Sequence, residues 1–84
     1  MPQLDTLVEL FGRLGIPVRR EPLGGDGGGL CAMRGQRVLF VDTSADEVTQ
    51  RECCLRALAR VPEADAMYLS PSLREAIERI KQDM

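Results

Sequence analysis

The stretch Gly28-Gly29-Leu30-Cys31-Ala32-Met33-Arg34-Gly35-Gln36-Arg37-Val38-Leu39-Phe40-Val41-Asp42 decides the fold. Two largely apolar runs, 30–34 and 37–42, flank the pair Gly35-Gln36. A glycine at the first central position is what a type II′ hairpin turn requires. The sequence therefore predicts an antiparallel β-hairpin over Gly28–Asp42.

The expected pairing of Arg34 with Arg37 determines which side chains share a face, because successive residues of a strand point to opposite sides. One face carries Leu30, Ala32, Leu39 and Val41, and the other carries Cys31, Met33, Val38 and Phe40. A hairpin with one solvated face would alternate apolar and polar residues. We therefore expect both faces to be covered, by the chain's own helices or by another chain.

Upstream of the hairpin, apolar positions at steps of three and four predict a helix over Leu4–Leu14, which Gly15 ends. A short strand is expected at Ile16–Arg20, at a sheet edge because a proline within it cannot donate to a ladder. Five of the eight glycines lie in the following segment, and glycine loses the most entropy on ordering. We expect a flexible glycine-rich loop at 23–29.

Downstream, a capping-box spacing at Ser44–Glu47 predicts a helix capped by Asp42 or Ser44 that runs to about Arg60. Its expected inward positions are Val48, Cys54, Leu55, Leu58 and Val61. A brief strand is expected at Ala66–Leu69.

Ser70-Pro71 is typical of a cap and first turn of a last helix. The apolar stripe of this helix is Leu73, Ala76, Ile77, Ile80 and Met84. The prediction is a small α+β protein with the order α-β-β-β-α-(β)-α, a single domain over residues 1–84 with the hairpin packed by helices.

Composition narrows the class of protein. The chain has 84 residues, of which 44% are hydrophobic and 29% charged, which suits one globular domain. No apolar run of about 18 residues is present, so no membrane-spanning helix is expected. The start, Met1–Asp5, does not resemble a secretory signal. Three cysteines, two of them adjacent, make a poor disulfide framework, so we expect a cytoplasmic protein with reduced thiols.

Charge argues against nucleic acid as a partner. The net charge is −2 and the pI is about 5.0, so the basic footprint that neutralises phosphates is missing. All basic residues except Lys81 are arginines. We interpret this as the codon bias of a GC-rich bacterial genome.

The sequence contains no catalytic, cofactor-binding or metal-ligating pattern. Histidine, the usual general base and commonest metal ligand, is absent. The adjacent Cys53 and Cys54 lack a Cys-x-x-Cys partner, and only Arg51 or Arg56 would lower a thiol pKa. We expect no cofactor and no enzymatic activity. An enzyme that uses a reactive thiol ranks third among the hypotheses, after an interaction module and an anion-binding protein.

One anion-binding pattern remains. Backbone N–H groups of a glycine-rich loop can bind anions, although here no Gly-Lys-Ser/Thr follows and the loop leads into a strand. Two arginines opposite each other in the hairpin would favour an anion or an acidic partner between them. The candidate contact residues are Arg34, Arg37, Gly25, Asp26 and Gly27. The simpler interpretations are a mobile connection and exposed turn arginines.

The segment Leu4–Arg60 has a helix, then Leu14-Gly15-Ile16-Pro17-Val18, then a hairpin that ends in Val38-Leu39-Phe40-Val41-Asp42, and then another helix. This layout resembles the front half of ImmA/IrrE-type metallopeptidases. That family carries His-Glu-x-x-His on the helix. Here the helix reads Gln50-Arg51-Glu52-Cys53-Cys54-Leu55, so the resemblance implies no zinc and no peptidase activity. Gly28-Gly29-Leu30-Cys31 before the hairpin also resembles short uncharacterised bacterial proteins, which implies no function.

The leading hypothesis is a small protein–protein interaction or regulatory module without catalytic activity. It would form a homodimer or bind a protein partner through the twice-apolar hairpin or through the stripe of the last helix. The alternative, from another class, is a binding protein for a small anionic ligand.

Overall fold

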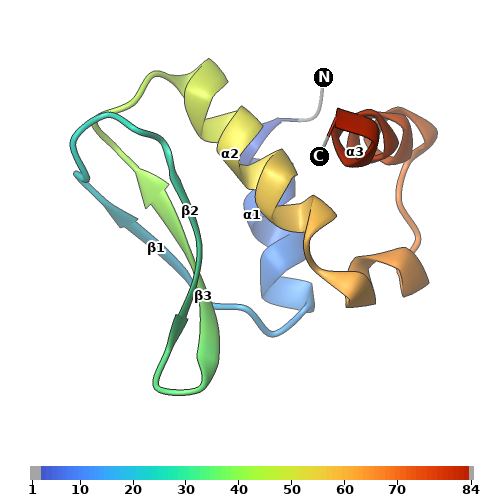
Figure 1. Cartoon of the computed structure of the whole chain (residues 1–84), viewed down its shortest axis with the longest axis horizontal. Helices are drawn as coiled ribbons and strands as arrows, with labels where there is room; N and C mark the ends of the chain where they lie inside the picture. Colours follow the sequence, from blue (N-terminus) through green and yellow to red (C-terminus); the bar gives the residue numbers. More distant parts are fainter. Residues whose placement is uncertain (1–2, 84) are drawn as a thin grey trace.

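A three-stranded sheet of order β1-β3-β2 lies on one side of the molecule, and the helices lie on the other (Figure 1). The computed structural model describes residues 3–83. Its elements are α1 (Leu4–Arg13), β1 (Val18–Glu21), β2 (Gly28–Met33), β3 (Gln36–Asp42), α2 (Glu47–Ala59), the 3₁₀ helix η1 (Pro62–Ala66) and α3 (Pro71–Asp83). The predicted α+β class is confirmed. The strand expected at Ala66–Leu69 is absent, because α2 separates this segment from the sheet and leaves it no strand to pair with.

The strand β1 occupies a sheet edge, as predicted, and runs parallel to the central strand β3. The helix before it ends at Gly15, whose φ of +75° is a left-handed conformation that glycine adopts without strain. Pro17, just before β1, accepts a hydrogen bond from the Leu39 N–H through its carbonyl (2.9 Å). Its missing N–H lies just before the first residue of the strand, a position at which a sheet tolerates proline.

The hairpin is present, but its turn lies one residue earlier than predicted. Arg34 and Gly35 form the turn with φ values of +54° and +77°, so it is of type I′, not type II′ at Gly35-Gln36. Arg37 consequently pairs with Ala32, and the two arginines are not cross-strand partners, which removes a like-charge opposition. The shift moves every partner by two residues, so the predicted division of side chains between two faces is retained.

The core lies between the sheet and the helices. Leu39 and Val41 of β3 and Leu7 and Phe11 of α1 belong to one core cluster, and all four side chains are buried. The predicted inward positions of α2 are buried except Val48, which is 50% exposed. Val48 lies on the first turn of α2, two turns before the stretch that packs into the core.

The sequence predicts the N-cap of α3 correctly but not the N-cap of α2. The N-cap of α2 is Asp46, whose Oδ1 accepts from the Thr49 N–H (2.8 Å), and not Asp42 or Ser44 as expected. At α3 the Ser70 Oγ accepts from the Leu73 N–H (3.3 Å), as predicted. The predicted stripe of α3 packs against the core through Leu73, Ala76, Ile77 and Ile80, and Met84 lies outside the described residues.

Candidate functional site

The glycine-rich loop binds an anion that belongs to this chain, the carboxylate of Asp42. The Asp42 side chain is fully buried at the end of β3. Its Oδ1 accepts from the N–H groups of Leu23 (2.8 Å) and Ser44 (2.9 Å), and its Oδ2 accepts from Gly25 (2.6 Å) and Gly27 (3.1 Å). Burial raises the pKa of this carboxyl, but the four backbone hydrogen bonds outweigh it and lower the pKa from 3.8 to about 2. The carboxylate therefore holds the loop that crosses the end of β3.

The three predicted loop contacts thus have different roles. Gly25 and Gly27 donate their N–H groups to the Asp42 carboxylate. Asp26 is exposed, and its carbonyl accepts from the Cys53 thiol at 3.5 Å. A Cβ added at Gly27 would lie 2.4 Å from that sulfur, so the loop sits tightly on α2.

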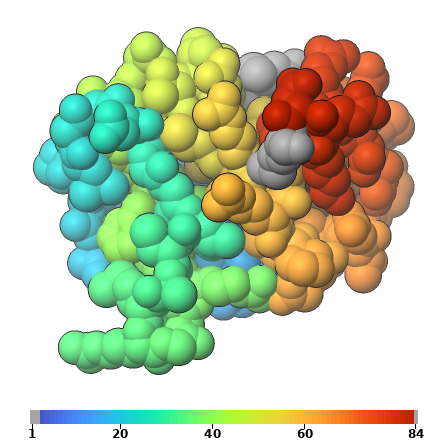
Figure 2. Space-filling model, viewed as in Figure 1, coloured from blue at the N-terminus to red at the C-terminus, as the bar shows by residue number. Residues whose placement is uncertain are grey.

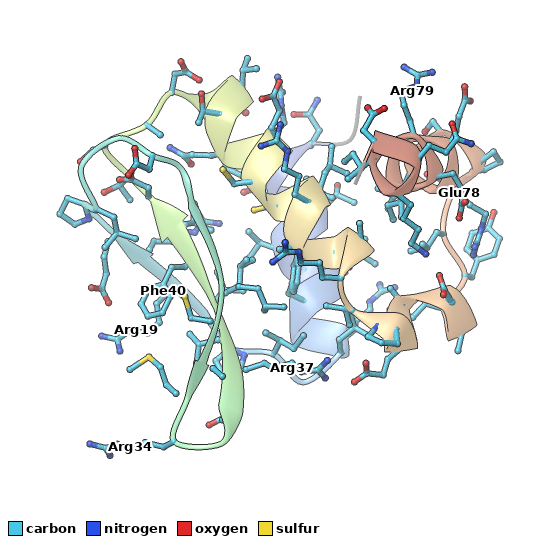
Figure 3. All side chains as sticks on the ribbon, viewed as in Figure 1. Arg19, Arg34, Arg37, Phe40, Glu78 and Arg79 are labelled. Carbon is cyan, nitrogen blue, oxygen red and sulfur yellow. The ribbon has the colours of Figure 1, made fainter. Side chains whose placement is uncertain are left out.

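The structure places Arg34 and Arg37 at the opposite end of the hairpin from the loop (Figure 3). The six residues of β2 span about 20 Å. Arg34 is exposed at the hairpin tip, and Arg37 makes a two-pronged ion pair with Glu63 of η1. This contact raises the pKa of Arg37 and lowers the pKa of Glu63. The predicted loop and arginine contacts are therefore not brought together.

The face of the sheet that points away from the helices, called here the outer face, carries Cys31, Met33, Val38 and Phe40. Cys31 and Met33 are exposed and Phe40 is partly exposed, whereas Val38 is buried. No helix within residues 3–83 packs over this face (Figure 1; Figure 3). The guanidinium of Arg19 lies over the ring of Phe40 on this face, 5.7 Å from the ring centre. Cys31, on a face that the sequence predicts to be covered, is exposed here.

A hollow of about 430 Å³ lies between β2 and α2, which run side by side on the face shown in Figure 2. It is lined by Asp26, Gly28, Gly29, Leu30, Cys53, Arg56, Ala57 and Arg60. The structure shows no carboxylate partner for Arg56 or Arg60 among the side chains of residues 3–83. Sequence reasoning missed this site, although the four-residue spacing of the two arginines places them on one helix face.

The environment of the adjacent cysteines keeps their thiols protonated. Burial raises the pKa of Cys53, and burial together with the neighbouring sulfur raises that of Cys54 to about 11. A nucleophilic thiolate requires the opposite shift. Within the part of the chain that the structure describes, no group of three metal-ligating side chains occurs, and no helix is long and apolar enough to cross a membrane.

Comparison with known proteins identifies no relative. No family model, no curated protein and no solved structure matches the chain. The layout resemblance to ImmA/IrrE-type metallopeptidases stays a prediction.

Proposed function

We propose that this protein is a non-catalytic protein–protein interaction module that forms a homodimer through the outer face of its sheet. The observation that carries the proposal is the exposed apolar surface of Cys31 and Met33 on this face, over which no helix of residues 3–83 packs. An apolar centre with a polar rim is typical of protein interfaces. A domain of 84 residues also gains usefully from burial of additional apolar surface.

The charges around the outer face favour a second copy as the partner. Arg19 and Glu21 of β1 form an ion pair of 2.7 Å at the rim, so both signs are present within one short strand. A two-fold axis presents the same patch to itself, and each sign then meets its opposite. The same face would be a poor match for a partner of one strong charge.

The proposal includes a location in a bacterial cytoplasm, and the cysteines support it. All three are free, and Cys31 is exposed on the proposed contact. Free exposed thiols persist in reducing surroundings, which agrees with a bacterial cytoplasm.

Size-exclusion chromatography with light scattering tests the proposal from low to high micromolar concentration. We expect twice the 9.3 kDa mass of one chain for the wild type. The Met33→Glu variant should be a monomer, because it places a charge on the outer face at a side chain that is already 42% exposed. Val48→Glu, at a 50% exposed position on α2, is the matched control and should remain a dimer.

Two results would contradict the homodimer: a wild type that stays monomeric at every concentration, or a Met33→Glu variant that dimerises as the wild type does. The anion-binding alternative has weaker support, because the loop N–H groups already bind Asp42 and Arg37 already pairs with Glu63.

A further inference from the structure

The two edge strands of the sheet differ in whether they carry residues that prevent pairing with another strand. The β1 edge carries three charged residues, Arg19–Glu21, between Pro17 and Pro22. Charges and prolines are the usual means by which edge strands avoid pairing with other chains. The β2 edge, Gly28–Met33, has neither a charge nor a proline. It is the open edge of this sheet.

Backbone groups along the β2 edge alternate in direction. The Asp42 N–H donates to the Gly27 carbonyl. In an antiparallel pair every second residue bonds to the neighbouring strand, so this bond and the register of β2 and β3 identify the residues of β2 that bond to β3. Gly28, Leu30 and Ala32 point their N–H and C=O groups away from β3. These six groups have no hydrogen-bond partner within the described chain. Alternating donors and acceptors at this spacing are complementary to another strand, not to a small anion.

The hollow beside this edge supplies the charge that selects the partner. Arg56 of α2 and Arg60, the C-cap residue of that helix, line it against a single carboxylate, Asp26. The lining therefore carries a net charge of one positive unit. A second copy paired edge to edge would bring two such arginine pairs together, which is unfavourable.

We propose that an extended peptide segment with acidic side chains at alternate positions adds to β2 as a fourth strand. Its acidic side chains would lie over the hollow against Arg56 and Arg60. Its other side chains would extend the outer face beside Cys31 and Met33, and are apolar for that reason. This edge adjoins the proposed dimer contact at Cys31 and Met33, and the monomeric Met33→Glu variant tests peptide binding apart from dimer formation.

Isothermal titration of the wild type with the acetylated and amidated peptide VEVEVEV tests the proposal. The comparison peptides are VKVKVKV and two N-methylated forms of VEVEVEV, one methylated on its valines and one on its glutamates. We expect binding of VEVEVEV, no binding of VKVKVKV, and loss of binding for one N-methylated form only. That selectivity follows because alternate N–H groups of an added strand face the edge.

Protein variants separate the two parts of the site. Arg56→Gln combined with Arg60→Gln should weaken the binding of VEVEVEV by about tenfold or more. Ala32→Pro removes an outward N–H and obstructs the edge without removing a β2–β3 hydrogen bond, and should also weaken binding. Arg13→Gln, at an exposed position of α1, is the matched control and should bind as the wild type does. Circular dichroism confirms that each variant is folded.

A labelling experiment locates the peptide. Bound VEVEVEV should slow the alkylation of Cys53, which lines the hollow, in both the wild type and the monomeric Met33→Glu variant. The proposal is overturned by absence of VEVEVEV binding, by equal binding of VKVKVKV, by full affinity in the double arginine variant, or by tolerance of both N-methylated peptides. Inorganic phosphate or free glutamate binding as tightly as the peptide would overturn it in favour of a small-anion site.

Discussion

At the scale of single residues, Asp42 is the most constrained side chain of the protein. It is an ionised carboxylate with no exposed surface, and four backbone N–H groups replace the water that it loses. A buried charge is tolerated only with such compensation. Because three of the four donors come from the loop that joins the two edge strands, the carboxylate ties this loop to the end of the central strand β3.

Asp42→Asn should lower the melting temperature at neutral pH, because the amide NH₂ would face backbone donors. The pKa of Asp42 is lower in the folded chain than its ordinary 3.8, so its ionised form stabilises the fold above about pH 4. This contribution is lost as the pH falls through 3.8 toward about 2. The wild type and the variant should therefore converge over this range in thermal unfolding followed by circular dichroism.

Asp26→Asn is the control for that comparison, since its carboxylate is exposed in the same loop and accepts no hydrogen bond. It should melt close to the wild type at every pH. An Asp42→Asn variant as stable as the wild type at neutral pH would show that the carboxylate does not hold the loop.

At the scale of elements, the junction between the loop and β2 depends on a close backbone approach. Gly28 has a φ of +96°, and a Cβ added to it would lie 2.0 Å from the carbonyl oxygen of Phe40. Any side chain there would push β2 away from β3. The glycine is therefore required by packing as well as by its dihedral angle.

Gly28→Ala should lower the free energy of unfolding by about 3 kcal/mol or more, from the collision and the left-handed backbone together. Gly12→Ala, in the last turn of α1 with open space around it, should raise the free energy of unfolding by about 0.5–1 kcal/mol. Urea unfolding measures both. Equal stabilities for the two variants would refute this account of the junction.

At the scale of the whole molecule, the three cysteines report on three different environments. Cys31 lies on the outer face, Cys53 lines the hollow and Cys54 is in the core. Their accessibility decreases in that order, which makes them internal probes of both proposed contacts.

Limiting iodoacetamide followed by mass spectrometry should label Cys31 first, Cys53 more slowly and Cys54 last, because only exposed thiolates react quickly. The rate at Cys31 should fall as the protein concentration rises, if the outer face is the dimer contact. Denaturation in urea should make the three rates similar. Rapid labelling of Cys54 in the folded protein would contradict the predicted order.

The sequence by itself determined the local elements of this protein. Periodicity predicted the helices, the glycine and serine signals predicted their ends at Gly15 and Ser70, and two apolar runs predicted the hairpin at Gly28–Asp42. These features depend on residues only a few positions apart, whose preferences are visible in the sequence. Even the error in the turn left the two faces unchanged, because side chains repeat every second residue.

Only the tertiary structure decided what the candidate site contains. It assigned Asp42 to donors up to 19 residues earlier, paired Arg37 with Glu63 26 residues later, and left Arg56 and Arg60 beside the open edge of β2. It also showed that the helices cover one apolar face of the hairpin, and that on the other face Cys31 and Met33 are exposed while Val38 is buried. Such contacts depend on how helices pack against a sheet, and neither turn preferences nor periodicity specifies that arrangement.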